Sequence, residues 1–190
     1  MIEGLLACGV PVSAIGIQSH QHQGYWGREK IEAVLSRYEK FGLPIHFTEN
    51  TIVSGPAIPP EIRDLNDFRY EDNVSTPEYE EKQKNQMEEM YRILFEEHPL
   101  VKAVTNWDFG DGAWLNAPSG LIRRDGSVKP SYEMLKNLIW GEWSTNLELK
   151  TDSKGIVNFE GFKGEYSVFV NGKTTSFTLN DNSADITIQL

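Results

Sequence analysis

The chain has 190 residues, and its content of hydrophobic residues, 39%, is enough to bury a core and form one domain or two small ones. Its formal net charge of −10 argues against nucleic acid as a partner, because nucleic-acid binding needs a basic surface that neutralises phosphates. A neutral polysaccharide tolerates this charge. The single cysteine, Cys8, cannot form an internal disulfide and leaves the cellular compartment undecided.

The first part of the chain, residues 1–142, alternates between helical and strand patterns, which is typical of βα units around a parallel sheet. The apolar stretch 2–10 contains Glu3 and lacks a basic segment before it, so we predict neither a signal peptide nor a membrane span in this chain. Gly9 would end a short helical segment there, and residues 14–20 read as the first strand. A helix follows from about residue 28 to Gly42, and 44–49 is the second strand.

A long loop over 50–75 separates the second strand from the next helix. Thr76 as N-cap and Pro77 in the first turn mark the start of that helix. Its buried stripe is expected to be Met87, Met90, Tyr91 and Leu94. The third strand covers 101–107, and a loop rich in Gly, Asp and Trp leads from it to a helix over 130–140. The order is therefore βα, repeated three times.

The last part, residues 143–190, changes to a period of two, which predicts a small antiparallel β-sandwich-like domain. The pair Asn171-Gly172 between two alternating runs is a strong signal for a type I′ hairpin. The alternating apolar positions are Tyr166, Val168 and Val170 in one run and Ile186, Ile188 and Leu190 in another.

Candidate catalytic residues stand at the carboxyl ends of the predicted strands, where parallel barrels place their active sites. These are His20, Glu49 and Trp107, and strict alternation would put Glu49 with Ile45 and Phe47 on the face that also carries Gln18 and His20. A glutamate at such a mouth can attack an anomeric carbon, and a neighbouring imidazole can hold its charge and rotamer.

Four ordered motifs resemble the last three strands, the sixth to the eighth, of the family 10 glycoside hydrolases, the endo-1,4-β-xylanases. They are Ile-Gly-Ile-Gln-Ser-His at 15–20, Phe-Thr-Glu at 47–49, Asn-Trp at 106–107 and Lys-Pro-Ser-Tyr at 129–132. The resemblance implies an α/β fold, part of a TIM (β/α)8 barrel, over roughly 1–140, and a retaining enzyme without a cofactor or metal. It implies that Glu49 is the nucleophile, that His20 orients it, and that Gln18, Trp107 and Trp114 contact the polysaccharide.

Two departures from the family pattern have consequences. Asn50-Thr51 stands where the family has Leu-Asp after the nucleophile, so the carboxylate of that aspartate is absent. The family's acid/base glutamate belongs to the first half of the barrel, which this chain lacks, so we expect the chain to need that half for activity. The resemblance also implies an extracellular location for the full-length parent.

Two other functions remain open at this stage. His20-x-His22 with Asp108 is similar to metal-dependent amidohydrolase barrels, but the expected face of His46 and the place of His98 at a helix end do not complete a ligand set. Alternatively, the tryptophans and the β domain bind a polysaccharide without turnover. Xylan affinity that survives Glu49→Gln but not Trp107→Ala would favour this second alternative.

Overall fold

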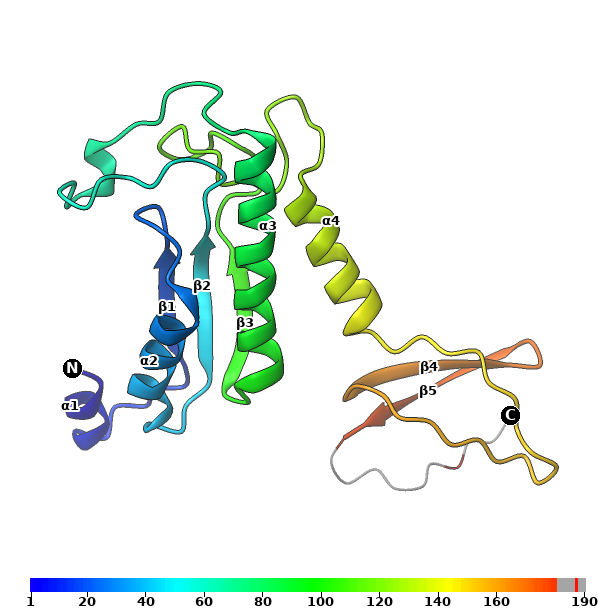
Figure 1. The fold of residues 1–190 in the computed structure, drawn as a ribbon. Coiled ribbons are helices and arrows are strands. Elements are labelled where there is room, and N and C mark those ends of the chain that lie inside the picture. The colour runs from blue at the N-terminus through cyan, green and yellow to red at the C-terminus, as the bar shows by residue number, and fades with distance from the viewer. Residues whose placement is uncertain (181–186, 188–190) are drawn as a thin grey trace. The chain divides into compact units, whose positions relative to one another are not determined.

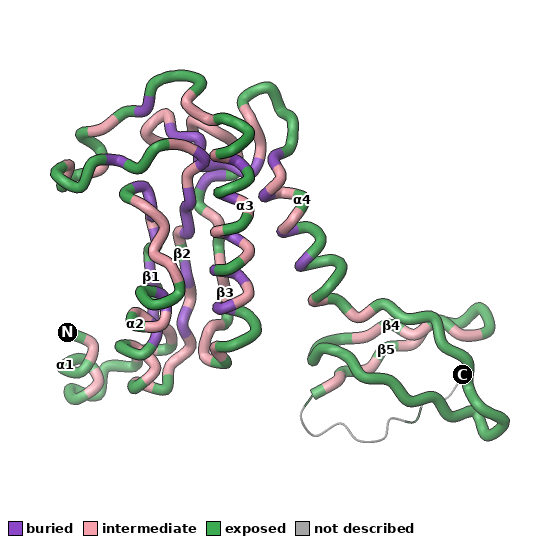
Figure 2. Tube along the Cα trace, in the orientation of Figure 1, coloured by how far each residue is buried: buried purple, intermediate pink, exposed green. Residues whose placement is uncertain are grey.

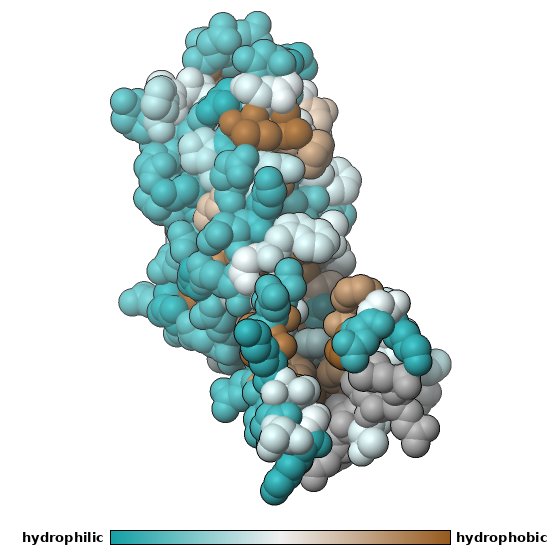
Figure 3. Space-filling model, turned by 90° about the vertical axis from the view of Figure 1, so that its right-hand side faces the viewer, coloured by the Kyte–Doolittle hydropathy of each residue, from teal (hydrophilic) through white to brown (hydrophobic). Residues whose placement is uncertain are grey.

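The computed structural model describes residues 1–180 and 187. The chain divides into two compact units, Met1–Leu135 and Lys136–Leu190. The predicted boundary between residues 142 and 143 lies inside the second of these units. The described helices include none that is both long enough and apolar enough to cross a bilayer. Figure 3 shows a predominantly hydrophilic face, in keeping with the excess of acidic residues.

The first unit is built on a three-stranded parallel sheet with the order β1-β2-β3. The strands are β1 (Ile15–His20), β2 (Ile45–Thr51) and β3 (Val101–Asn106). Helix α1 (Ile2–Ala7) precedes the sheet, α2 (Gly27–Glu39) connects β1 to β2, and α3 (Pro77–Arg92) with a π turn, Ile93–Glu97, connects β2 to β3. Figure 1 shows all three strands pointing in one direction, with the long loops at their carboxyl ends. The predicted βα order is therefore confirmed.

Capping residues mark the start of α3 and the end of α2. The hydroxyl of Thr76 accepts a hydrogen bond from the backbone N–H of Tyr79, which caps the start of α3 as predicted. Gly42 follows α2 with φ of 64°, a left-handed conformation that glycine adopts without the cost other residues incur. Two strand ends differ from the prediction, because β2 continues two residues beyond Glu49 and β3 ends one residue before Trp107.

The core of this unit lies on one side of the sheet. Figure 2 shows buried residues along β1 and β2 and on the sides of α2 and α3. Fully burying each large apolar side chain contributes roughly 1.5–3 kcal/mol, so these contacts hold the helices and the sheet together. The buried residues are Ile15, Ile17, Ile45 and Phe47 from the strands and Ile31, Leu35, Met87, Met90 and Leu94 from the helices.

A second, smaller core lies among the loops at the carboxyl ends of the strands. Ile58, Tyr70 and Ala117 are buried there and join the loop after β2 to the loop after β3. A short 3-10 helix, Leu65–Asp67, gives this region local order. The side chain of Asp64 caps its start by accepting a hydrogen bond from the backbone N–H of Asn66. The long loop is thus a packed structure, and it can position side chains at the strand ends.

Helix α4 (Pro130–Asn137) begins in the first unit, and it continues as a π turn, Leu138–Glu142, in the second. The second unit holds an antiparallel hairpin of β4 (Gly164–Val170) and β5 (Lys173–Leu179). Its turn, Asn171-Gly172, has both φ angles positive, at 50° and 78°, so the predicted type I′ turn is confirmed. The strand expected around Ile186, Ile188 and Leu190 falls outside the described residues. The sandwich-like domain therefore stays a prediction.

Candidate active site

The candidate residues come together at the carboxyl ends of the three parallel strands. β1 and β2 are paired in step as far as Ile17 opposite Phe47, and the next pair is Gln18 opposite Glu49. Thr48 is thus one extra residue in β2, and such a β-bulge changes the direction of the side chains that follow it. Glu49 consequently shares a face with Gln18.

This arrangement corrects the expected alternation along the second strand. Ile45 and Phe47 are fully buried, whereas Gln18 is exposed, so these two side chains do not lie on the face that carries Gln18. Strict alternation from Phe47 would have turned Glu49 towards the buried face. Glu49 reaches the open face because of the bulge at Thr48, and not because of alternation.

The carboxylate of Glu49 is held by two side chains of β1. Gln18 donates from Nε2 to Oε1 over 2.9 Å, and Nε2 of His20 lies 2.8 Å from Oε2. The side chains of His20 and Glu49 are 16% and 23% exposed, so the pair is shielded but still open to a substrate. Hydrogen bonds to both oxygens of a carboxylate in such a place fix its rotamer.

Two indole rings surround the imidazole of His20. The ring centre of Trp114 lies 5.0 Å from that of His20, and the ring centre of Trp107 lies 5.8 Å away with its plane nearly perpendicular. The backbone N–H of Trp107 donates to the backbone oxygen of Asn50, while 48% of the residue is exposed. Trp114 donates from Nε1 to Asn66. The structure thus brings together all five predicted site residues, Gln18, His20, Glu49, Trp107 and Trp114.

His22 lies beside the candidate site, at a place that the sequence pattern does not reveal. It is fully buried, its ring centre lies 6.1 Å from that of His20 and 5.1 Å from that of Trp114, and neither ring nitrogen has a partner among the described residues. Burial is the main cause that lowers the pKa of His22 to about 4. His22 is therefore neutral at physiological pH and fills the space behind His20 and Trp114.

Asp108 also lies close to the imidazole but does not contact it. Its carboxylate is buried and accepts a short hydrogen bond from the hydroxyl of Ser119, while its backbone oxygen accepts one from Asn106. Burial raises the pKa of Asp108, and the hydrogen bond from Ser119 opposes that rise. Asp108 is therefore a buried polar group of the loop after β3, and no hydrogen bond joins it to Glu49 or His20.

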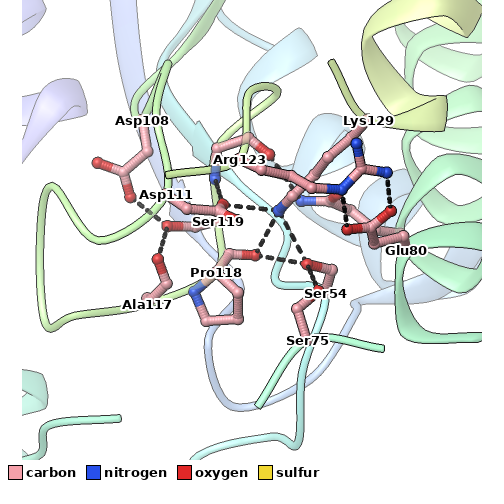
Figure 4. Close-up of polar contacts among 12 residues, drawn as sticks. Ser54, Ser75, Glu80, Asp108, Asp111, Ala117, Pro118, Ser119, Arg123 and Lys129 are labelled. Carbon is pink, nitrogen blue, oxygen red and sulfur yellow. Dashed lines mark hydrogen bonds and ion pairs between the residues drawn. The ribbon is translucent and has the colours of Figure 1, made fainter. Parts of the chain in front are cut away.

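A buried polar cluster, which contains Ser54, Asp111, Pro118 and Lys129, fixes the loop that carries both tryptophans (Figure 4). The ammonium of Lys129 is fully buried and donates to Asp111 over 2.6 Å, to Ser54 over 2.9 Å and to the backbone oxygen of Pro118 over 3.2 Å. Burial lowers the pKa of Lys129, and the bond to Asp111 opposes this. All three ammonium donors are used, so the cluster ties the loops after β2 and β3 together.

The residues considered for a metal site lie in different settings. His46 pairs with Gly16 in the sheet and so lies on the open face, contrary to the face expected from alternation. His98 contacts the carboxylate of Glu39, at a helix end, as the sequence indicates. Within residues 1–180 and 187, no three side chains among His, Cys, Asp and Glu converge in a way that could hold a metal ion.

A family model, that of glycosyl hydrolase family 10, matches residues 1–138. Among curated proteins, the endo-1,4-beta-xylanase of Geobacillus stearothermophilus is 26% identical over 117 residues, which cover 61% of this chain and 33% of that protein. Endo-1,4-beta-xylanase 2 of Arabidopsis thaliana is 24% identical over 182 residues, or 95% of this chain and 14% of that protein. The chain spans a third or less of the length of these two relatives.

Solved structures give the same picture of the fold. A GH10 endoxylanase retrieved from sugarcane soil metagenome matches with a TM-score of 0.60 and 26% identity, over 73% of this chain and 45% of that chain. Xylanase 10B from Thermotoga maritima matches with a TM-score of 0.55 and 27% identity, over 75% of this chain and 41% of that chain. The parallel sheet and its helices are thus similar to part of a GH10 xylanase fold.

Proposed function

This chain belongs to glycosyl hydrolase family 10, and from that premise we propose that it carries the nucleophile half of a retaining endo-1,4-β-xylanase active site. Glu49 is the nucleophile in this proposal. The observation that carries it is the position of the Glu49 carboxylate at the strand ends, bonded on one oxygen to Gln18 and on the other to His20. A carboxylate that is held in one orientation and is partly exposed is placed for attack on an anomeric carbon.

The reaction would proceed through two displacements. Glu49 attacks the anomeric carbon and forms a glycosyl ester while the bond to the leaving sugar breaks, and water then hydrolyses the ester. The leaving oxygen needs a proton, which a second carboxylic acid supplies in retaining enzymes, about 5–5.5 Å from the first. We assign that acid to the part of the family barrel that lies outside these 190 residues.

The two tryptophans support a polysaccharide substrate. Trp107 is 48% exposed beside the Glu49–His20 pair, and a flat indole face suits the apolar face of a pyranose ring. Trp114 is held by Asn66 and lies closer to His20. We propose that they line the sugar site next to the nucleophile. A polymeric substrate cannot cross a membrane, so we expect the hydrolysis to take place outside the cell.

The first test is hydrolysis of xylan by the gene product that carries this sequence. We expect Glu49→Gln to reduce kcat by at least about 10³-fold, because the neutral amide cannot form the glycosyl ester. Glu61→Gln, which changes an exposed carboxylate of the long loop, is the matched control and should leave the rate unchanged. If Glu49→Gln retained ordinary activity, Glu49 would not be the nucleophile.

A second test observes the intermediate itself. A 2-deoxy-2-fluoro xylobioside with a good leaving group should form an ester that hydrolyses slowly, so the protein should gain the mass of one fluoroglycosyl unit. Peptide mapping should place that mass on the segment that contains Glu49. Labelling of another carboxylate, or release of the inverted anomer from xylan, would contradict the retaining mechanism.

The non-catalytic alternative is separated by binding measurements on the same variants. We expect Glu49→Gln to bind xylan but not to hydrolyse it. We expect Trp107→Ala to lose both affinity for xylan and rate of hydrolysis, because the indole ring that lines the sugar site is removed. If the unaltered protein bound xylan without hydrolysing it, although an acid/base glutamate was present in its sequence, the chain would be a binding protein rather than an enzyme.

A further inference from the structure

The ring nitrogen of His20 that faces away from Glu49 lies beside a hydroxyl group. Nδ1 lies 3.2 Å from the hydroxyl oxygen of Thr51, which stands where the family pattern has an aspartate. Thr51 is fully buried, so water does not satisfy its hydroxyl. Within residues 1–180 and 187, the hydroxyl of Thr51 has one hydrogen-bond partner, which is Nδ1 of His20.

The hydrogen bonds around the ring can be assigned from the chemistry of each partner. The Glu49 carboxylate can only accept, so the 2.8 Å contact requires His20 Nε2 to donate. The buried hydroxyl of Thr51 carries one hydrogen that must find an acceptor, because a buried donor without one costs about 1–3 kcal/mol. The unprotonated Nδ1 of a neutral imidazole is such an acceptor, whereas the protonated Nδ1 of an imidazolium is not.

We propose that Thr51 is a positioning residue that keeps His20 as a neutral imidazole with its proton on Nε2. This inference rests on the proposed function of Glu49 as nucleophile and adds to it the protonation state of the neighbouring ring. In this state the ring still donates to Glu49, and the pair keeps the full negative charge of the carboxylate. A carboxylate at position 51 would instead accept from Nδ1–H and stabilise the imidazolium.

The neutral ring has a consequence for the proposed reaction. When Glu49 forms its bond to the anomeric carbon, the leaving group departs with a proton from the second carboxylic acid, and the charge of Glu49 is lost in the ester. An imidazolium beside the ester would then have no anionic partner in contact. A neutral His20 avoids that cost, and its Nε2–H can stay bonded to the ester oxygen.

The other titratable groups around His20 do not replace the missing carboxylate. Asp108 lies near the ring, but its carboxylate is bonded to Ser119. His22, behind the ring, is buried and carries no charge at neutral pH. The remaining neighbours, Trp107 and Trp114, are neutral. Glu49 is thus the one anion in contact with the ring within the described residues.

The experiment is nitrogen NMR of the histidine rings in the ¹⁵N-labelled gene product at about pH 8, above the ordinary titration range of histidine. A His20→Gln variant assigns the His20 signals. We expect Nε2 to show the shift and proton coupling of a protonated nitrogen and Nδ1 those of an unprotonated, hydrogen-bonded one. A protonated Nδ1 at this pH would overturn the proposal.

Three variants at position 51 separate the hydroxyl from the charge. Thr51→Ser keeps the hydroxyl and should leave both ring signals in place, and Thr51→Val removes it and should shift the Nδ1 signal while Nε2 stays protonated. Thr51→Asp should protonate both nitrogens. An Nδ1 signal that is the same in Thr51→Val as in the unaltered protein would also overturn the proposal, even if Thr51→Asp did not fold.

This measurement is independent of turnover. If xylan hydrolysis were absent but the ring signals followed the expected pattern, the proposed function would fail and the role of Thr51 in setting the protonation of His20 would stand. If hydrolysis depended on Glu49 but Nδ1 carried a proton, the proposed function would stand and the role of Thr51 would fail.

Discussion

His22 links the stability of the site to pH at the scale of a single residue. Its pKa falls from 6.5 to about 4 on folding, because burial disfavours the charged ring. Between these two values the unfolded chain binds the proton and the folded chain does not. The free energy of unfolding therefore decreases as pH falls from 6.5 towards 4, by up to about 3 kcal/mol.

Replacing the ring with one that cannot titrate tests this directly. We expect His22→Phe to lose less stability than the unaltered protein between about pH 6.5 and pH 4, with the difference approaching about 3 kcal/mol at the acid end. The variant also removes two buried nitrogens that have no partner in the described residues. Urea unfolding at several pH values measures both effects.

His98 provides the comparison for that experiment. It is bonded to the carboxylate of Glu39 rather than left without a partner, so His98→Gln should not abolish the loss of stability between pH 6.5 and 4. If His22→Phe and the unaltered protein lost stability in parallel over this range, His22 would be protonated in the folded state. The assignment of a neutral, buried ring to His22 would then be wrong.

At the scale of elements, the loop after β3 depends on one buried ion pair. Lys129 and Asp111 are joined over 2.6 Å, with side chains 0% and 8% exposed. Asp111 also accepts a hydrogen bond from the N–H of Gly120, where a Cβ atom would approach the backbone of Gly110 to within 2.4 Å. The loop that carries Trp114 is therefore folded around Asp111, and it requires glycine at position 120.

Breaking this pair should be more harmful than removing it. We expect Lys129→Met to destabilise the protein by about 3–5 kcal/mol, because it leaves the Asp111 carboxylate buried without its cation. The double variant Lys129→Met with Asp111→Asn should recover part of that loss, because no buried charge remains. Thermal unfolding measures both, and equal stability of the single and double variants would show that the pair does not act as a unit.

The sequence predicts an element well where interactions between neighbouring residues determine its conformation. It predicts less well where contacts between distant segments determine it. The N-cap at Thr76 and the turn at Asn171-Gly172 follow from short-range chemistry and are confirmed. The side of the sheet on which the Glu49 side chain lies depends on a bulge at Thr48, and no local sequence pattern predicts one extra residue in a strand. The burial of Lys129 depends on the loops after β2 and β3, which meet only in the fold, so its role could not be predicted from its neighbours in sequence.

At the scale of the whole molecule, the sheet presents one covered and one open face. Ile15, Ile17, Ile45 and Phe47 are buried on the side of the helices, whereas Gly16, Gln18 and Thr48 on the other side are exposed. In a closed (β/α)8 barrel, that second side is the interior, which side chains from all eight strands fill. The chain matches a third or less of each of these two curated relatives, and we propose that a longer family 10 barrel covers the open face and completes the site.

The final prediction follows from this open face. We expect the 190 residues by themselves to hydrolyse xylan at least about 10²- to 10⁴-fold more slowly than a polypeptide that also contains the first five strands of the barrel, since general-acid help is worth that much. Co-expression with those strands should restore the rate and raise the unfolding temperature, because the open face becomes buried. A Glu49→Gln chain, co-expressed in the same way, is the control: it should gain stability without gaining activity. Rapid hydrolysis by the 190 residues alone would mean that the acid lies within them, and would contradict its assignment to the other half of the barrel.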